Sequence, residues 1–211
     1  EIAHAHGAMV YADIVHAAGC MPLDVKESGV DFAACASYKW LMGDFGLGFL
    51  YARKDRLPLL PRTQWGYYGM NRFTSHVYPL DPPGDTVADY GFEASAMGRF
   101  SFGTHSHMVV AQLHHSLDYI ARLGPENIQN HAQALLAPLR EELMKRGYAL
   151  ATPPESRAPI LTCILEDAAG KLRARLAAAN VQIMVSRNRF RVTPSVFNDM
   201  EDIERLLAAL P

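Results

Sequence analysis

Three short apolar runs between residues 9 and 51 constrain the fold more than any other feature of the sequence. They cover residues 9–13, 32–37 and 47–51, and glycine and proline occur in the connections between them. Apolar runs of this length, bounded by such residues, are typical of strands buried on both faces of an α/β sheet. We therefore predict an α/β fold with a mostly parallel sheet in this part of the chain.

Reactive side chains follow the first two of these runs. Asp13 ends the first run, and Ser37, Tyr38 and Lys39 lie at the end of the second. In open α/β sheets, ligands bind at the carboxyl ends of the strands. An acid and a lysine at neighbouring strand ends, with glycines close by, indicate a binding or catalytic site.

The order and spacing of these residues resemble the core of the class V aminotransferase family. That family contains fold-type I enzymes that depend on pyridoxal 5'-phosphate, among them isopenicillin N epimerase-like proteins, cysteine desulfurases, kynureninases and serine–glyoxylate-type aminotransferases. The resemblance implies the cofactor and the fold but leaves the substrate open. Three motifs carry it: Asp13-x-x-His16, Ser37-Tyr38-Lys39 and Gly43-x-x-Gly46-x-Gly48-Phe-Leu-Tyr51.

The resemblance implies a role for each of these side chains. Lys39 would form a Schiff base with the cofactor aldehyde and later move protons at the substrate α-carbon. Asp13 would hold the proton on the ring nitrogen, which keeps the ring an electron sink. His16 would bind the phenolic oxygen of the ring, and Ser37 and Tyr38 would bind the phosphate. Taken singly, Asp13 is also explained as a helix cap, His16 as a buried histidine and Lys39 as a surface lysine.

A later motif, GRFSFGT at residues 98–104, is similar to the RFExGT turn of the family. Thr104 matches the family threonine, whereas Ser101 replaces the glutamate. In the family this threonine reaches the cofactor phosphate of the neighbouring subunit. The match therefore implies a homodimer with a shared active site. A helix N-cap is the structural alternative for Thr104.

The closing motif of the family is an arginine on a strand followed seven residues later by an asparagine. Arg191 and Asn198 have this spacing, with Phe197 where the family has tyrosine. The resemblance implies that Arg191 binds the substrate α-carboxylate, for which a guanidinium offers a planar fork. Arg187 and Arg189 are competing candidates.

The predicted elements divide the chain into three parts. Residues 1–105 would be the C-terminal part of the cofactor-binding large domain, 106–124 a linking helix and 125–211 a small α+β domain. Because about half of the polypeptide precedes this point in the resembled family, we expect the C-terminal portion of a longer enzyme. In the small domain we predict a helix after Pro125 that is kinked or broken at Pro138, strands at 159–165, 181–184 and 190–192, a helix at 168–179, and a last helix capped by Asn198 with Glu201.

Two aromatic or proline-rich stretches have no defined role at this level. The loop QWGYYG at residues 64–69 is equally compatible with a packed surface loop and with a wall of the substrate pocket. Residues 80–90 are predicted to form an exposed turn.

Composition narrows the class of partner. The chain has 211 residues, 49% of them hydrophobic, and a formal net charge of -2 at pH 7. Without a basic excess, nucleic acid is not an expected partner. No apolar run approaches the length of a membrane span, so a membrane partner is not expected either. We expect a cytoplasmic location.

Cysteine and histidine placement bears on the chemistry. Cys20, Cys35 and Cys163 are scattered and odd in number, which predicts buried free thiols. In the resembled family, desulfurases carry a nucleophilic cysteine on a loop just before the arginine or in a separate active-site loop. Residues 181–191 contain no cysteine and Cys163 lies in an apolar run where a thiol is expected to be inert, which disfavours desulfurase chemistry. His4 and His6 are predicted to be surface histidines, since residues i and i+2 of a helix point to different faces.

These features together predict a pyridoxal-phosphate-dependent enzyme that acts at the α-amino group or Cα of an amino-acid-like substrate. Transamination, epimerisation or racemisation, and elimination remain open, as does C–S or C–C cleavage of the cysteine lyase or kynureninase type. A non-catalytic scaffold is the alternative from another class. The joint presence of Asp13, Lys39, Thr104 and Arg191 argues against it.

Overall fold

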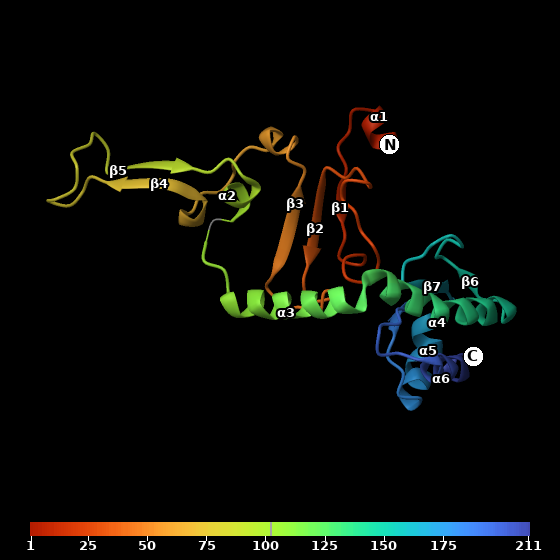
Figure 1. Ribbon diagram of the computed structural model, residues 1–211. Helices are drawn as coiled ribbons and strands as arrows, with labels where there is room; N and C mark the ends of the chain where they lie inside the picture. The colour runs from red at the N-terminus through yellow and green to blue at the C-terminus, as the bar shows by residue number, and fades with distance from the viewer. Residues whose placement is uncertain (102) are drawn as a thin grey trace. The chain divides into compact units, whose positions relative to one another are not determined.

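The computed structural model describes residues 1–101 and 103–211, and it separates into two compact units (Figure 1). The first unit contains residues 1–15 and 24–115, and the second contains residues 16–23 and 116–211. Phe102, which belongs to the GRFSFGT motif, lies outside the described residues.

The first unit is built on a three-stranded sheet of β1 (Tyr11–Asp13), β2 (Phe32–Ala36) and β3 (Gly48–Ala52), in that order. β1 and β2 are parallel, as predicted, whereas β3 is antiparallel to β2. The connection 37–47 is too short to contain the crossover helix that a parallel return needs. The prediction that all three runs are buried on both faces is wrong for β1 and β3, because most of their side chains are exposed in the described residues, whereas β2 is mostly buried.

Before the sheet lies the short helix α1 (Ile2–Ala5), and Gly7 follows it with a φ of 71°. A buried carboxylate then anchors the start of β2. Asp31 accepts hydrogen bonds from Val10 N at 2.8 Å, His4 Nε2 at 2.7 Å and Arg56 Nε at 3.0 Å, and Arg53 Nη1 lies 3.1 Å away. His4 is exposed, as predicted, and its bond to Asp31 ties α1 to the sheet.

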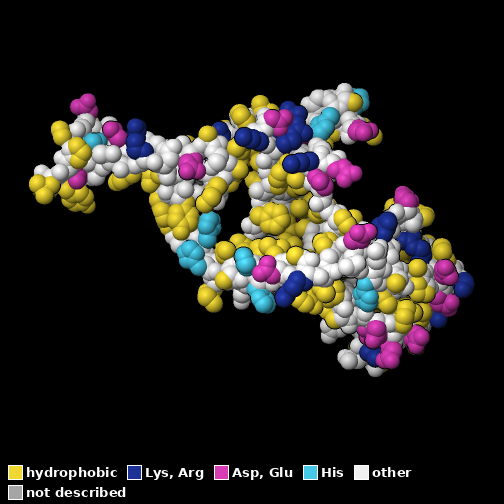
Figure 2. Space-filling model, in the orientation of Figure 1, with side chains coloured by type: hydrophobic (Ala, Val, Ile, Leu, Met, Phe, Trp, Pro, Cys, Tyr) yellow, Lys and Arg dark blue, Asp and Glu magenta, His cyan; other side chains and the backbone are white. Residues whose placement is uncertain are grey.

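A hairpin of β4 (Met70–Ser75) and β5 (Ala88–Phe92) follows the 3-10 turns η1 (Leu57–Leu59) and η2 (Tyr67–Gly69). The sequence predicted loops here, because these strands mix polar and apolar residues without a clear alternation. Figure 2 shows hydrophobic side chains along the hairpin, and several of them are exposed, among them Phe73, Tyr78 and Tyr90.

The GRFSFGT motif is not a simple turn. α2 (Ala96–Phe100) covers its beginning, with Ser95 Oγ accepting a hydrogen bond from Gly98 N at 3.1 Å. The next helix, α3 (His107–Leu123), begins three residues after Thr104. The alternative role of Thr104 as its N-cap is therefore wrong.

The second unit pairs a four-stranded antiparallel sheet with helices. The sheet order is β6 (Ala149–Leu150), β7 (Leu161–Ile164), β9 (Arg189–Val192) and β8 (Met184–Ser186). The predicted strands and helices are present in sequence order, except that the strand predicted at 181–184 lies at Met184–Ser186, and β6 is found in addition. The helices are α4 (Pro125–Lys145), α5 (Ala168–Ala178) and α6 (Met200–Ala209). Their shared core contains Leu139, Leu143, Leu161, Cys163, Leu172, Phe190, Ile203 and Leu206.

α4 runs unbroken through Pro138, although the sequence predicted a kink or a break there. The proline lies on the exposed side of the helix, and its neighbours Leu135 and Leu139 are buried in the core. This packing outweighs the loss of one backbone hydrogen bond. The helix ends at Lys145, shortly before Gly147, which has a φ of 82°.

The N-cap of α6 is Asp199, not the predicted Asn198. The Asp199 side chain accepts hydrogen bonds from Glu201 N and Asp202 N, and Asp202 completes the capping box. Asn198 is used just before the helix, because its Oδ1 accepts from Ser195 N at 2.9 Å. The predicted pair was thus placed one residue too far toward the N-terminus, which a capping pattern read from sequence alone does not resolve.

Within residues 1–101 and 103–211, no helix is long and apolar enough to cross a membrane. The same residues contain no group of three or more histidine, cysteine, aspartate or glutamate side chains arranged to hold a metal ion.

Candidate active site

The loop that carries Lys39 is tied down by its first residue. Ser37 is fully buried, and its hydroxyl donates toward the carbonyls of Asp44 at 2.7 Å and Leu47 at 3.0 Å. Gly43 packs directly on it, since a Cβ at this position would lie 2.8 Å from Ser37 Cβ. The backbone of Lys39 is therefore held in place between β2 and β3.

Lys39 opens onto a cavity of about 950 Å³ in the first unit. Asp13 at the end of β1 and Tyr38 and Lys39 just after β2 all line it. Their meeting follows from the parallel pairing of β1 and β2, in which Asp13 is in register with Ala34. The volume lies within the range of small-molecule sites.

The charges of Asp13 and Lys39 act on the same point of this cavity. Burial raises the pKa of the Cys35 thiol, the Asp13 carboxylate raises it further, and Lys39 lowers it. Asp13 Oδ1 accepts one hydrogen bond, from Val15 N at 3.0 Å. The cavity lining thus combines a carboxylate, an amine and a buried thiol whose pKa is raised.

Aromatic side chains form one wall beside the lysine. The rings of Tyr38 and Phe45 stack with centroids 4.9 Å apart and an interplanar angle of 27°. Lys39 Nζ lies 5.8 Å from the Tyr38 ring centroid. A flat aromatic ligand would find both a stacking surface and an amine there.

Another wall comes from α2 and the residues after it. Met97, Phe100, Ser101 and His105 line the cavity, whereas Thr104 is exposed and is not among the described lining residues. The loop 64–69 contributes no residue to the described lining either. In the sequence, the position of His105 directly after the Gly103-Thr104 turn is compatible with an approach to the cofactor without metal binding, and the structure places His105 in the cavity lining.

Two further predicted residues, His16 and Arg191, belong to the second unit. The His16 carbonyl accepts a hydrogen bond from the Cys20 thiol at 3.3 Å. On β9, Phe190 and Val192 point into the core, and Arg191 between them takes the other face of the sheet, where its register partners are Thr162 and Met184.

The Arg191 guanidinium contains a buried Nε that has no hydrogen-bond partner among the residues described. Arg187 and Arg189 are exposed, whereas Arg191 is partly buried. A buried N–H without a partner is costly, and an anionic ligand would satisfy it. This favours Arg191 over its two neighbours as the carboxylate-binding arginine.

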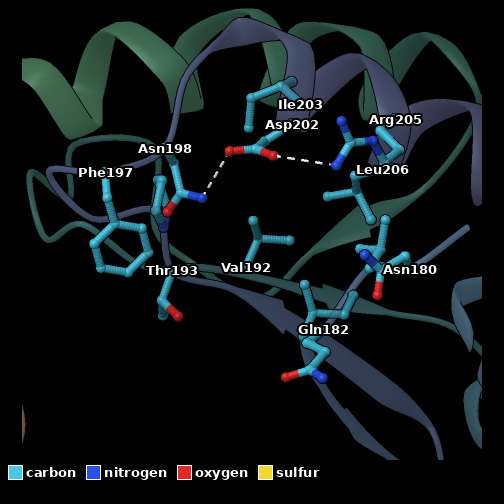
Figure 3. A pocket seen from close by; sticks show the side chains of 13 residues that line it. Asn180, Gln182, Val192, Thr193, Phe197, Asn198, Asp202, Ile203, Arg205 and Leu206 are labelled. Atoms are coloured by element: carbon cyan, nitrogen blue, oxygen red, sulfur yellow. Dashed lines mark hydrogen bonds and ion pairs between the residues drawn. The ribbon is translucent and has the colours of Figure 1, made fainter.

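A second cavity, of about 500 Å³, lies beside α6 in the second unit (Figure 3). Figure 3 shows Asp202 between Asn198 and Arg205, with Val192 and Leu206 below them. Asn198 Nδ2 donates to Asp202 at 2.9 Å, and Arg205 Nη1 lies 3.7 Å from the same carboxylate. These polar groups are occupied in holding the start of α6.

The three cysteines are free and buried, as predicted. Burial raises the pKa of Cys163 to about 12. A thiol with so high a pKa is not a nucleophile near neutral pH.

Comparisons with known proteins agree with this geometry. The sequence model of the family described as "Aminotransferase class-V" matches residues 1–196. The "Uncharacterized aminotransferase YcbU" of Bacillus subtilis (strain 168) is 25% identical, over 98% of this chain and 52% of its own length. The isopenicillin N epimerase of Streptomyces clavuligerus is 29% identical, over 100% of this chain and 54% of its own length.

Among solved structures, the apo cysteine desulfurase from Thermococcus onnurineus NA1 superposes with a TM-score of 0.79 at 22% identity, covering 98% of this chain and 52% of that one. This similarity confirms the predicted fold class. The chain spans about half the length of the relatives it matches.

Proposed function

The chain belongs to the class V aminotransferase family, and from this membership we propose that the protein is a pyridoxal-phosphate-dependent enzyme acting at the α-amino group or Cα of an amino acid. One observation supports the proposal above all others. Asp13, Tyr38 and Lys39 line a single cavity at the end of two parallel strands.

The cavity residues fit the chemistry of this cofactor. Pyridoxal phosphate supplies an aldehyde that condenses with amines and a ring that withdraws electrons from Cα. Lys39 would be the point of attachment and would then carry a proton to or from Cα. Asp13 would keep a proton on the ring nitrogen, for which its single backbone hydrogen bond leaves acceptor capacity.

The phosphate contacts are proposed from Tyr38, Ser37 and Thr104. The Tyr38 phenol lines the cavity and offers a donor. Ser37 contributes chiefly by fixing the loop, because its one proton is directed at loop carbonyls. Thr104 is proposed to reach the phosphate of a partner subunit in a homodimer, and its exposed side chain is compatible with that role. His16 is proposed to bind the phenolic oxygen of the ring.

Arg191 is proposed to bind the α-carboxylate of the substrate. The buried Nε of its guanidinium, which lacks a partner among the described residues, supports this assignment. A planar guanidinium would orient the amino acid by two parallel hydrogen bonds.

The proposal is tested by trapping the cofactor on the full-length protein. Incubation with pyridoxal phosphate, borohydride reduction and peptide mass spectrometry should give a pyridoxyl group on the Lys39 peptide. The peptides that carry Lys26 and Lys54 serve as internal controls, and the Lys39→Ala variant should give no adduct. An unmodified Lys39 peptide, together with no cofactor absorbance, would contradict the proposal and favour a non-catalytic scaffold protein.

A screen of amino acids then separates the possible reactions. An aminotransferase should exchange amino groups with a keto acid, and an epimerase should invert Cα. A lyase should release pyruvate, alanine or sulfide without any acceptor. Sulfide release is the outcome least expected, because Cys163 is buried with a raised pKa and residues 181–191 contain no cysteine.

A further inference from the structure

Two arginines tie together segments that are far apart in the first unit. Arg62 donates from Nη1 to the Gly98 carbonyl and from Nη2 to the Glu93 carbonyl at 2.5 Å. Its guanidinium also lies over the Phe92 ring, 4.6 Å from the centroid. The planar fork of an arginine suits such a double contact, and lysine does not reproduce it.

Arg99 makes the reciprocal contact. Its Nη1 donates to the Leu60 carbonyl at 2.5 Å, and its Nε donates to the Ala94 carbonyl at 3.2 Å. Each arginine thus binds the backbone of the segment that carries the other. We call Arg62 and Arg99 together the arginine clamp.

The backbones joined by the clamp are in direct contact. A Cβ at Gly69 would lie 2.5 Å from the Gly98 carbonyl oxygen, and Glu93 N donates to the Gly69 carbonyl at 2.9 Å. Only glycine fits at position 69 without moving this backbone. The joint between the two segments is therefore tight, and it fixes α2 against the residues around Gly69.

His105 contacts this joint through its ring. The ring packs against Tyr68, the neighbour of Gly69, with centroids 5.3 Å apart. His105 also lines the Lys39 cavity. The clamp thus connects the base of the hairpin to a side chain that faces the reacting groups.

The charges of the cavity indicate what His105 would bind. Among the described lining residues, Lys39 and His105 are the side chains that can carry a positive charge, and Asp13 carries the negative one. Once Lys39 is used to attach the cofactor, His105 is the remaining side chain of the described cavity lining that can donate a hydrogen bond while positively charged. The ligands of this site carry two anionic groups, the cofactor phosphate and the substrate carboxylate.

We propose that His105 binds an anionic oxygen of the ligand in the Lys39 cavity and that Arg62 is the positioning residue that holds it there through the arginine clamp. The proposal rests on the proposed function. It adds a binding residue and a structural support that the sequence motifs do not contain.

The test uses the full-length protein and measures cofactor binding as well as catalysis. Absorbance titration with pyridoxal phosphate gives the Kd, and initial rates give KM for the amino acid. We expect His105→Gln and Arg62→Ala each to raise one of these constants about tenfold, which corresponds to one hydrogen bond to a charged group. A raised Kd identifies the cofactor phosphate as the bound group, whereas a raised KM identifies the substrate carboxylate.

A double-mutant cycle separates positioning from general destabilisation. If Arg62 acts through His105, the variant that carries both His105→Gln and Arg62→Ala should have a Kd and a KM no higher than those of the weaker-binding single variant. Arg72→Ala is the matched control, an exposed arginine on β4, and should leave both constants unchanged. Arg62→Lys keeps one charged donor and should therefore show a smaller rise in Kd or KM than Arg62→Ala. It replaces Arg62→Ala in the experiment if that variant does not fold.

Two results would overturn the inference. One is a His105→Gln variant with wild-type Kd and KM. The other is a double variant in which the fold-increases in Kd or KM of the two single variants multiply. Both are distinct from failure of the proposed function, because they are measured on protein whose Lys39 adduct has already been trapped.

Discussion

Two aspartates at opposite ends of the parallel strands differ in how much of their hydrogen-bonding capacity is used. Asp31, before β2, is buried and is surrounded by Val10 N, His4 and two arginines. Asp13, at the end of β1, faces the cavity and accepts one backbone hydrogen bond. The first is a structural anchor, and the second keeps free acceptor capacity for a ligand.

For Asp13 we predict that Asp13→Asn lowers the turnover of the full-length enzyme about 100-fold or more, because it removes a fixed charge at the ring nitrogen. Cofactor attachment at Lys39 should persist, since the amide keeps the size of the carboxylate. The measurement is the initial rate together with the trapped Lys39 adduct. A variant with wild-type turnover would show that Asp13 is not beside the ring nitrogen.

For Asp31 we predict a loss of stability that depends on pH. The Val10 N–H, then His4 and then Arg56 hold the pKa of this carboxyl well below its ordinary value of 3.8. A lowered pKa contributes stability above the ordinary value, and this contribution is lost as the pH falls below it. Asp31→Asn should therefore lower Tm at pH 7, and the difference from wild type should shrink below about pH 4.

Calorimetric melting at pH 7 and pH 3 measures this difference. Asp55→Asn is the control, because Asp55 pairs with the same Arg53 and Arg56 but its side chain is 60% exposed. Its effect on Tm should be small. Equal effects of the two substitutions at pH 7 would contradict the anchoring role of Asp31.

In two secondary-structure elements, tertiary packing overrides the conformation that the local sequence favours. α4 continues through Pro138 because a row of leucines on its buried side holds it to the core. β4 and β5 form a hairpin although their sequences carry little strand pattern. In both cases contacts with other parts of the chain outweigh local sequence preference.

Replacing Pro138 measures how much this proline lowers the free energy of unfolding of the second unit. Pro138→Ala restores a backbone N–H that can bond to the carbonyl of residue 134, and the exposed site has room for alanine. We expect the second unit to become more stable by about 1–3 kcal/mol, less any gain in unfolded-chain entropy. Urea unfolding measures the change. A neutral or destabilising result would mean that α4 is shaped around the proline.

At the scale of the whole molecule, the proposed homodimer determines which chain completes each active site. Thr104 is exposed, whereas its neighbour His105 lines the cavity of the same chain. If Thr104 serves the partner, each site takes Lys39 from one subunit and Thr104 from the other.

Subunit mixing tests this arrangement. Lys39→Ala and Thr104→Ala subunits, each poorly active alone, should form heterodimers in which one of the two sites is intact. An equal mixture should regain about one quarter of the wild-type activity if half of the dimers are mixed. No recovery above the separate variants, with exchange confirmed by mass spectrometry, would place Thr104 in its own chain's site.

The sequence alone was enough to predict the family and the order of most elements. The spacing of Asp13, Tyr38 and Lys39 predicted a shared site, and local sequence patterns predicted the helices and strands of the second unit. These features are local, because strand ends, helix faces and helix stops depend on residues a few positions apart.

The tertiary structure alone decided which side chains meet. It turned β3 antiparallel, directed the Ser37 hydroxyl into its own loop, and brought His105 to the Lys39 cavity, where its ring contacts Tyr68. These features depend on residues that are distant in sequence, as Arg62 and Gly98 are, and no local pattern encodes such pairings. The residue types of the site were therefore predictable, whereas the walls and supports that position them were not.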